Sequence, residues 1–292
     1  MNPQSDTSSG AQPPTCTVGS VVVGGGTPAL IAGPCVAESA ALCLRVARAM
    51  RDLCAALEMP YVFKASYDKA NRTRADSYRG PGLTTGLDWL AQVRDEVGVP
   101  VLSDVHTPGE VAPAAEVLDC LQIPAFLCRQ TDLLLEAGRS GKPVNIKKGQ
   151  FMAPWDMGAA VEKVRHGRQG SGAGAGPDGA QVMLTERGTF FGYNRLVTDF
   201  RSLAQMRRFA PVVFDATHSV QEPSGLGTAS GGRREFAPVL ARAAMAVGAD
   251  ALFVETHPDP DSAKSDAASM VPLDGMEQML RRCLAVARAA SP

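Results

Sequence analysis

The sequence predicts an α/β protein with a single (β/α)8 TIM barrel and a short N-terminal β-hairpin. Eight short apolar segments alternate with helical patterns, and polar or charged residues follow each apolar segment. The 292 residues lie within the range of one such barrel, and a hydrophobic content of 45% can fill its core. A doubly wound open sheet is the alternative, but it would gather its polar groups at one switch point, and no GxGxxG motif follows the first strand.

The first residues of the chain differ in composition from the rest. Residues 1–17 are polar and rich in Pro and Ser, so we expect a disordered leader before a catalytic barrel domain at 18–292. The leader lacks the basic start and apolar centre of a secretory signal. Residues 18–23 are expected to form one arm of a hairpin that closes the bottom of the barrel. The glycine-rich segment 170–179 predicts a flexible surface insertion.

The barrel strands are expected at short apolar runs, of which 251–254 (ALFV) is typical of a strand buried on both faces. The expected strands are 29–32, 61–65, 99–103, 120–123, 144–148, 181–185, 212–214 and 251–254. Helices are expected where apolar residues recur three and four positions apart, as in 39–57, where arginines occupy the opposite face. The expected helices are 39–57, 85–97, 110–117, 131–140, 153–167, 197–209, 236–247 and 273–290.

Charge and cysteine usage exclude several classes of protein. A formal net charge of −1 and a pI of about 6.4 give no global positive field, so we expect no nucleic-acid partner. Seven scattered cysteines without a CxxC pair argue against a disulfide framework or a zinc ribbon and indicate a reducing compartment, the cytoplasm. No apolar run is long enough to predict a membrane span.

Cations follow several of the predicted strands. Because the carboxyl ends of barrel strands meet at one mouth, these cations predict a local anion site, with phosphate as the favoured anion. Each cation taken alone is better explained as a solvated surface charge, and the prediction depends on their joint position at the strand ends. The cations in question are Lys64, Lys69, Arg72, Arg74, Lys147, Lys148, Arg187, Arg233 and Arg234.

A second set of strand-end residues combines a thiol, an imidazole and two carboxylates: Cys35, His218, Glu255 and Asp266. These groups suit a divalent zinc, iron or manganese ion, and magnesium would not select a thiolate. The alternative is a buried hydrophobic cysteine, a hydrogen-bonded histidine and two salt-bridged carboxylates. Sequence spacing leaves both interpretations open.

The motifs at the strand ends resemble those of the 3-deoxy-D-manno-octulosonate 8-phosphate synthase family, from about residue 18 to the C-terminus. The KANR sequence at 69–72 is specific, since it separates this family from its sister, 3-deoxy-D-arabino-heptulosonate 7-phosphate synthase. The matching stretches are AGPCVAES (32–39), FKASYDKANRTR (63–74), LSDVH (102–106), LQIPAFLCRQTDLL (121–134), VNIKKGQFMAPWDM (144–157), TERGTFFGYNRLVTDFRSL (185–203), FDATHSVQ (214–221) and FVETHPDPDSAKSD (253–266).

The resemblance implies an aldol-like condensation of phosphoenolpyruvate with D-arabinose 5-phosphate and water, with release of phosphate, in the synthesis of the lipopolysaccharide sugar Kdo. It implies a cytoplasmic homotetramer that contains a divalent metal and needs no organic cofactor. Phosphoenolpyruvate would be held by Lys64, Lys69, Lys147 and Arg187, beside Gln122 and Phe126. The sugar phosphate would be held by Asn71, Arg72 and Ser230, partly across a subunit interface.

The same resemblance assigns roles in the chemistry. The residues expected to take part in catalysis are Lys69, Asp104, Lys147 and His218, of which Asp104 and His218 would move protons or order the attacking water. The metal ligands of the metal-dependent subfamily would be Cys35, His218, Glu255 and Asp266, and metal-independent members carry Asn in place of Cys35. The alternatives are the sister synthase acting on erythrose 4-phosphate and a non-catalytic barrel that serves as a binding module.

Overall fold

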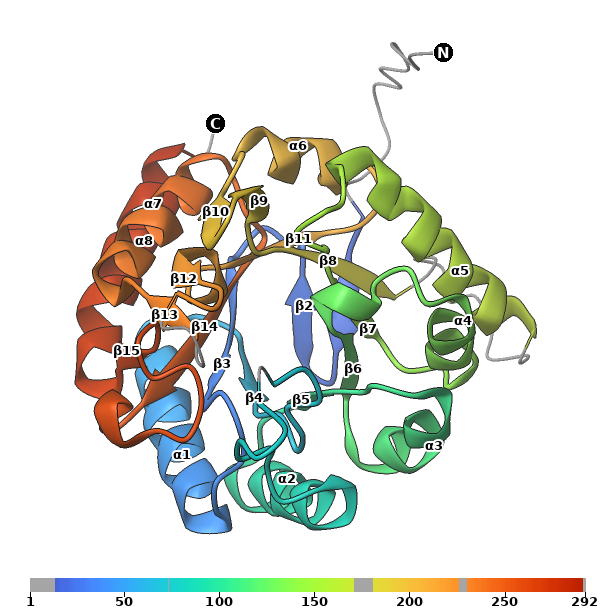
Figure 1. The fold of residues 1–292 in the computed structure, drawn as a ribbon. Helices are drawn as coiled ribbons and strands as arrows, with labels where there is room; N and C mark the ends of the chain where they lie inside the picture. The colour runs from blue at the N-terminus through green and yellow to red at the C-terminus, as the bar shows by residue number, and fades with distance from the viewer. Residues whose placement is uncertain (1–13, 73, 171–180, 226–229, 291–292) are drawn as a thin grey trace.

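Eight parallel strands form a closed ring with helices on its outside (Figure 1). The structure is a computed structural model that describes residues 14–72, 74–170, 181–225 and 230–290. The strands follow the order β3, β4, β5, β6, β7, β8, β11 and β14, and pairing of β14 with both β11 and β3 closes the ring. The predicted barrel is confirmed, and the open sheet is excluded because the ring has no free edge.

The barrel strands and the helices lie close to the predicted positions. The strands of the ring are β3 (Ala29–Gly33), β4 (Tyr61–Lys64), β5 (Val101–Asp104), β6 (Cys120–Ile123), β7 (Val144–Lys147), β8 (Val182–Glu186), β11 (Val212–Asp215) and β14 (Ala251–His257). The helices are α1 (Ala40–Ala56), α2 (Leu83–Val97), α3 (Pro108–Val117), α4 (Thr131–Arg139), α5 (Met157–Gly170), α6 (Arg201–Arg207), α7 (Ala237–Ala246) and α8 (Met276–Ala290).

An antiparallel hairpin precedes the barrel, as predicted, but it starts earlier than expected. Its strands are β1 (Cys16–Val18) and β2 (Val21–Val23), so 18–23 contains the end of one arm, the turn and the other arm. Gly19, at a φ of +56°, allows the tight turn. The hairpin therefore takes in the end of the segment that we assigned to the leader. Residues 1–13 of that leader, and all of the 170–179 insertion except Gly170, lie outside the described residues.

Three small pairings were not foreseen. A hairpin of β9 (Thr189–Gly192) and β10 (Arg195–Val197), with Asn194 at a positive φ of 55° in its turn, includes Val197, where a helix was expected to begin. Helix α6 begins only at Arg201. The strand pair β12 (Gln221–Glu222) and β13 (Gly231–Gly232) lies in the loop before α7. Strand β15 (Val271–Pro272) pairs with the end of β14 and lengthens that strand beyond its predicted end.

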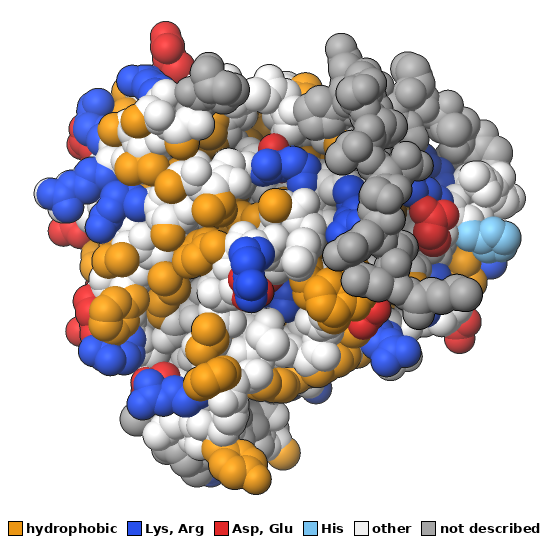
Figure 2. All heavy atoms as spheres, turned by 90° about the horizontal axis from the view of Figure 1, so that it is seen from above, with side chains coloured by type: hydrophobic (Ala, Val, Ile, Leu, Met, Phe, Trp, Pro, Cys, Tyr) orange, Lys and Arg blue, Asp and Glu red, His pale blue; other side chains and the backbone are white. Residues whose placement is uncertain are grey.

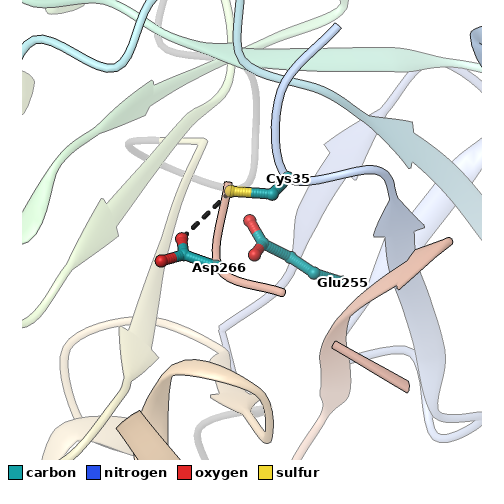
Figure 3. A group of neighbouring side chains, drawn as sticks. All are labelled: Cys35, Glu255 and Asp266. Carbon is teal, nitrogen blue, oxygen red and sulfur yellow. Dashed lines mark hydrogen bonds between the residues drawn. The ribbon is translucent and has the colours of Figure 1, made fainter. Parts of the chain in front are cut away.

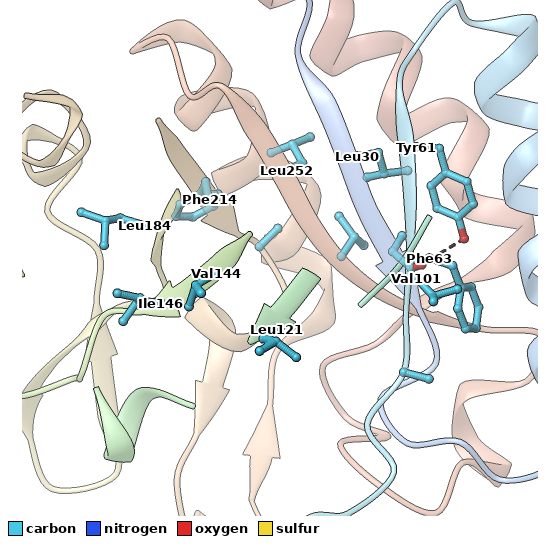
Figure 4. Packing of buried hydrophobic residues seen from close by; sticks show 14 of the residues in the cluster. Leu30, Tyr61, Phe63, Val101, Leu121, Val144, Ile146, Leu184, Phe214 and Leu252 are labelled. Atoms are coloured by element: carbon cyan, nitrogen blue, oxygen red, sulfur yellow. Dashed lines mark hydrogen bonds between the residues drawn. The ribbon is translucent and has the colours of Figure 1, made fainter. Parts of the chain in front are cut away.

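Side chains along each strand point alternately out of the ring and into it, and this divides the hydrophobic core into two parts. Outward side chains such as Leu30, Phe63, Phe214 and Leu252 pack between the ring and the helices (Figure 4). Inward side chains near the bottom pack against the hairpin: Ala29, Ile31, Val62, Leu102, Cys120, Met183, Val213, Ala251 and Phe253. Every second side chain of a strand points to the same face, so the next inward side chains lie two residues farther along, nearer the carboxyl ends of the strands. Those positions hold the polar residues described below.

The face shown in Figure 2 carries charges of both signs. Figure 2 shows Lys and Arg side chains interspersed with Asp and Glu on the face that it presents, with a band of hydrophobic side chains between them. This mixture agrees with the net charge of −1. Within the described part of the chain, no helix is both long and apolar enough to cross a membrane.

Candidate active site

Above the apolar layer, several strands direct buried polar side chains into the barrel, and six of these side chains line the candidate site. They are Lys64 of β4, Asp104 of β5, Gln122 of β6, Lys147 of β7, Asp215 of β11 and Glu255 of β14. In β5, for example, Leu102 lies in the apolar layer, and Asp104 is the next inward residue. The period of two residues thus gathers groups that are far apart in the sequence.

Three of the four predicted metal ligands lie within one cluster. Cys35 follows β3, Glu255 belongs to β14 and Asp266 lies in the loop after β14, and one ligand atom from each lies within 4.8 Å of the others (Figure 3). Cys35 Sγ is 3.0 Å from both Asp266 Oδ2 and Ser265 Oγ. The cluster forms because β3 and β14 are neighbours in the ring.

His218 faces the same cluster from the short helical turn His218–Val220 that follows β11. Its Nε2 atom lies 3.6 Å from Glu255 Oε1 and 3.8 Å from Asp266 Oδ2. Its Nδ1 atom lies 2.6 Å from Asp215 Oδ2. The imidazole therefore lies beside the two carboxylates of the cluster, while the group whose ligand atoms all lie within 4.8 Å of one another consists of Cys35, Glu255 and Asp266.

The residues of the cluster fit a metal ion. Glu255 Oε2 is buried and has no hydrogen-bond partner among the described residues. A buried carboxylate oxygen without a partner is costly, and a cation would satisfy it. Thiolate, imidazole and carboxylate together are ligands for zinc, iron or manganese.

The protonation of Cys35 depends on such a cation. Burial, and then the charges of Asp266 and Glu255, raise the pKa of the Cys35 thiol well above its usual value. Without a metal the thiol thus keeps its proton. Because a metal binds the thiolate, metal binding at this cluster must release that proton.

Two lysines lie against the cluster. Lys64 Nζ donates to Glu255 Oε1 at 2.9 Å and to the Cys35 carbonyl at 3.0 Å, and Lys69 Nζ lies 3.8 Å from Glu255 Oε1. Burial favours the neutral acid, but the charges of His218, Lys64 and Lys69 hold the pKa of Glu255 well below its usual range. Glu255 is therefore a carboxylate with cations on two sides.

Lys147 and Arg187 supply positive charge on the opposite side of the barrel interior. Lys147 donates to Asp215, and its Nζ lies 3.2 Å from the centre of the Phe253 ring. Burial lowers the pKa of Lys147 to about 8. Arg187 donates through Nη2 to Gln221 at 2.8 Å, whereas its buried Nη1 has no hydrogen-bond partner among the described residues. An anion would satisfy that donor.

A chain of hydrogen bonds fixes the position of Asp104. Gln122 Nε2 donates to Asp104 Oδ1 at 2.6 Å, and Ser66 Oγ donates to the other carboxylate oxygen. Asn145 Nδ2 in turn donates to Gln122 Oε1 at 2.8 Å, and Thr185 Oγ1 donates to Asn145 Oδ1 at 2.7 Å. The chain crosses the neighbouring strands from β8 to β5, so the orientation of Gln122 is set by partners on both sides.

The residues expected to bind the sugar phosphate lie farther out. Asn71 is exposed, and Ser230 is half-buried next to β13. Phe126, which was expected beside phosphoenolpyruvate, also lies at the surface, 48% exposed in the short helical turn Ala125–Leu127. Arg72 donates to the carbonyl groups of Tyr78 at 3.0 Å and Lys264 at 3.4 Å. Lys264 precedes Asp266 by two residues, so Arg72 contacts the loop that carries a metal ligand.

Several cations of the predicted anion site are not part of it. Lys148 points out of the ring, because it follows the inward Lys147, and it pairs with Glu186 at 3.4 Å. Arg74, Arg233 and Arg234 form ion pairs with nearby carboxylates at the protein surface. The prediction that all strand-end cations converge was therefore wrong for these four residues.

Comparison with known proteins places this geometry in a family. A profile of the DAHP synthetase I family matches residues 5–288. The chain belongs to this family. Proteins named 2-dehydro-3-deoxyphosphooctonate aldolase are similar along nearly their whole length. The protein from Syntrophotalea carbinolica is 57% identical, over 94% of this chain and 96% of its own. Those from Granulibacter bethesdensis and Nitrobacter winogradskyi are 55% and 53% identical, over 95% and 96% of this chain and 96% of each of their own.

These relatives confirm the resemblance that the strand-end motifs indicated, since that name denotes the 3-deoxy-D-manno-octulosonate 8-phosphate synthase reaction.

The prediction from the sequence did not include one prominent residue of the site. Asp215 is completely buried and contacts both Lys147 and His218, yet only His218 was selected from the FDATH stretch. The available signal was an acidic residue at the end of an otherwise apolar strand.

Proposed function

We propose that this protein condenses phosphoenolpyruvate with D-arabinose 5-phosphate and water to give 3-deoxy-D-manno-octulosonate 8-phosphate and inorganic phosphate. The oxygen of water joins carbon 2 of phosphoenolpyruvate, carbon 3 joins the aldehyde carbon of the sugar, and the bond from carbon 2 to the phosphate oxygen breaks. The main support is the buried set of cations beside a thiol, imidazole and carboxylate cluster, together with relatives above 50% identity.

The cations suit phosphoenolpyruvate, which carries a carboxylate and a phosphate. Lys64, Lys147 and Arg187 are each at most 5% exposed, so an anion bound there is largely removed from water. Charge-assisted hydrogen bonds are strong in such surroundings, and they would also lessen repulsion from the second phosphorylated substrate. Lys69 would complete this group, and Gln122 would contact the same substrate.

We assign the metal site to Cys35, His218, Glu255 and Asp266. A zinc, iron or manganese ion held there would supply Lewis acidity toward the aldehyde oxygen or water. Two observations support this assignment. Glu255 Oε2 is buried without a hydrogen-bond partner among the described residues, and the four side chains offer a mixed set of sulfur, nitrogen and oxygen ligands.

Asp104 is suited to hold the attacking water and to accept a proton from it. Burial alone would favour the neutral acid, but the charges of Lys64, Lys69 and His106 hold the pKa of Asp104 well below its usual range. Hydrogen bonds from Ser66 and Gln122 fix the orientation of the carboxylate. The lone pairs of its oxygens that are still free to accept a hydrogen bond therefore point in a fixed direction. Positioning of this kind is a main source of rate enhancement.

We propose that Asn71, Arg72 and Ser230 hold the sugar phosphate, partly across a subunit interface of a homotetramer, and that Phe126 lies beside bound phosphoenolpyruvate. Exposed aromatic side chains support association of subunits, since a soluble monomer seldom leaves so many uncovered. These side chains are Phe126, Phe151, Trp155, Phe190, Phe191 and Tyr193. The cytoplasmic location and the place in Kdo synthesis belong to the same proposal.

The decisive assay compares aldose phosphates. Purified protein loaded with zinc, iron or manganese is incubated with phosphoenolpyruvate and either D-arabinose 5-phosphate or erythrose 4-phosphate, and released phosphate and the sugar product are measured. We expect turnover with the arabinose phosphate. Preference for erythrose 4-phosphate would instead establish the sister reaction, and absence of turnover with both under every metal would support a non-catalytic barrel.

A further inference from the structure

Asp215 lies beneath both halves of the site. Its carboxylate is completely buried at the end of β11 and accepts hydrogen bonds through both oxygens. Oδ2 accepts from Lys147 Nζ and from His218 Nδ1, the latter at 2.6 Å. Oδ1 accepts from the His218 backbone N–H at 2.9 Å and from Thr217 Oγ1 at 3.2 Å. One oxygen atom is thus shared by the imidazole of the metal cluster and the ammonium of the anion site.

The contact with His218 determines which nitrogen of the imidazole is free. An ionised carboxylate only accepts hydrogen bonds, so the proton of the ring must lie on Nδ1. Nε2 then carries its lone pair on the side of Glu255 and Asp266, at 3.6 Å and 3.8 Å from their oxygens. A carboxylate behind a ligand histidine fixes the ring and increases its basicity toward a metal.

The contact with Lys147 links the same oxygen to the substrate. Among the described residues, Asp215 is the carboxylate with which Lys147 forms an ion pair. When a bound anion takes part of the positive charge of Lys147, less of that charge is left to neutralise Asp215. More of the negative charge of Asp215 then acts on His218, which strengthens Nε2 as a ligand.

We propose that Asp215 is a positioning residue that couples the metal site to the anion site, acting on the metal through His218 and on phosphoenolpyruvate through Lys147. This proposal rests on the proposed function, because it takes phosphoenolpyruvate as the anion. Coupling between two ligands is reciprocal, so phosphoenolpyruvate tightens metal binding by the same factor by which the metal tightens phosphoenolpyruvate.

The test measures metal affinity and does not depend on turnover. Zinc is titrated into metal-free protein against a competing chelator, with and without saturating phosphoenolpyruvate. In the wild type we expect phosphoenolpyruvate to tighten zinc binding about fivefold or more. In D215N we expect zinc binding to weaken about 10-fold to 100-fold, and the effect of phosphoenolpyruvate to disappear.

Two further variants separate coupling from a general loss of structure. D104N alters another buried aspartate that contacts neither His218 nor Lys147 in the described structure, and we expect its zinc affinity to stay within about twofold of the wild type. K147M removes the ammonium that neutralises Asp215, so it should bind zinc at least as tightly as the wild type does with phosphoenolpyruvate, and phosphoenolpyruvate should add no further effect. K147M therefore tests the coupling even if D215N does not fold.

Four results would overturn the proposal. Zinc affinity of folded D215N equal to that of the wild type would remove the role toward His218. A phosphoenolpyruvate effect that persists in D215N or K147M would mean that the two ligands interact without Asp215. Failure of wild-type protein to bind phosphoenolpyruvate in direct calorimetry would overturn both the coupling and the proposed function. Normal turnover with no effect of phosphoenolpyruvate on zinc binding would overturn the coupling alone.

Discussion

Cys35 Sγ and Asp266 Oδ2 lie 3.0 Å apart, although 231 positions separate the two residues in the sequence. The contact exists because β3 and β14, the first and last strands of the ring, are hydrogen-bonded neighbours. Closure of the barrel therefore assembles the metal cluster, and Lys64 of β4 contacts the cluster from the barrel interior through Glu255.

Removal of metal should abolish activity, and zinc, iron or manganese should restore it. C35S should weaken metal binding about 10-fold or more, since a hydroxyl replaces the thiolate. C54A is the matched control, because Cys54 is a buried cysteine of α1. Chelator competition measures both affinities. Full activity of wild-type protein after exhaustive chelation would contradict the metal assignment.

The Cys35 thiol, whose pKa is raised by burial and by neighbouring carboxylates, should release its proton when metal binds at pH 7. Zinc titration in weak buffer should therefore acidify the solution by about one proton more in the wild type than in C35S. Equal proton release by both proteins would show that the thiol is not a ligand.

The affinity for phosphoenolpyruvate should fall at alkaline pH. Burial lowers the pKa of Lys147 to about 8, so the cation is present below this pH and is lost above it. We expect kcat/KM for phosphoenolpyruvate to decline as pH rises through about 8. In K147R, whose guanidinium stays charged, that decline should be absent. A flat wild-type profile up to pH 10 would contradict this role of Lys147.

Loss of Arg187 should affect phosphoenolpyruvate selectively. R187M removes a buried guanidinium whose Nη1 lacks a hydrogen-bond partner in the described structure, and kcat/KM for phosphoenolpyruvate should fall about 100-fold or more. R281M, at an exposed arginine of α8, is the control and should be nearly neutral. Equal effects of the two substitutions would remove Arg187 from the site.

The polar chain across β5 to β8 should contribute to stability as well as catalysis. N145L leaves Gln122 Oε1 without its donor, and the free energy of unfolding should fall by about 1–3 kcal/mol in urea titrations. T185V removes only the outermost donor and should cost less, about 1 kcal/mol. A larger loss in T185V than in N145L would show that the chain is not organised around Asp104.

The sequence predicted the barrel because each strand is a short apolar run followed by a helical pattern. It also predicted the buried site residues, since strand ends converge in such a fold. It did not separate Lys147 from Lys148, which depends on the register of β7, because a shift of one residue reverses the direction of every side chain. The same uncertainty concealed Asn145, an inward polar residue in an apolar strand.

The sequence did not reveal which partner each strand-end side chain contacts. Arg74, Arg233 and Arg234 are strand-end cations by position, but nearby carboxylates pair with them at the surface. The shared oxygen of Asp215 likewise needs coordinates, because Lys147 reaches it from 68 positions away. Short pairings such as β9 with β10 depend on turn geometry at Asn194 that no apolar pattern marks.

The most direct test is a crystal structure of the protein with bound metal and phosphoenolpyruvate, in which anomalous scattering locates the ion. We expect the ion about 2.3 Å from Cys35 Sγ and about 2.0–2.2 Å from His218 Nε2 and from oxygens of Glu255 and Asp266. We also expect the anionic groups of phosphoenolpyruvate on Lys147 and Arg187. An ion bound away from Cys35, or phosphoenolpyruvate bound outside the barrel mouth, would contradict the account.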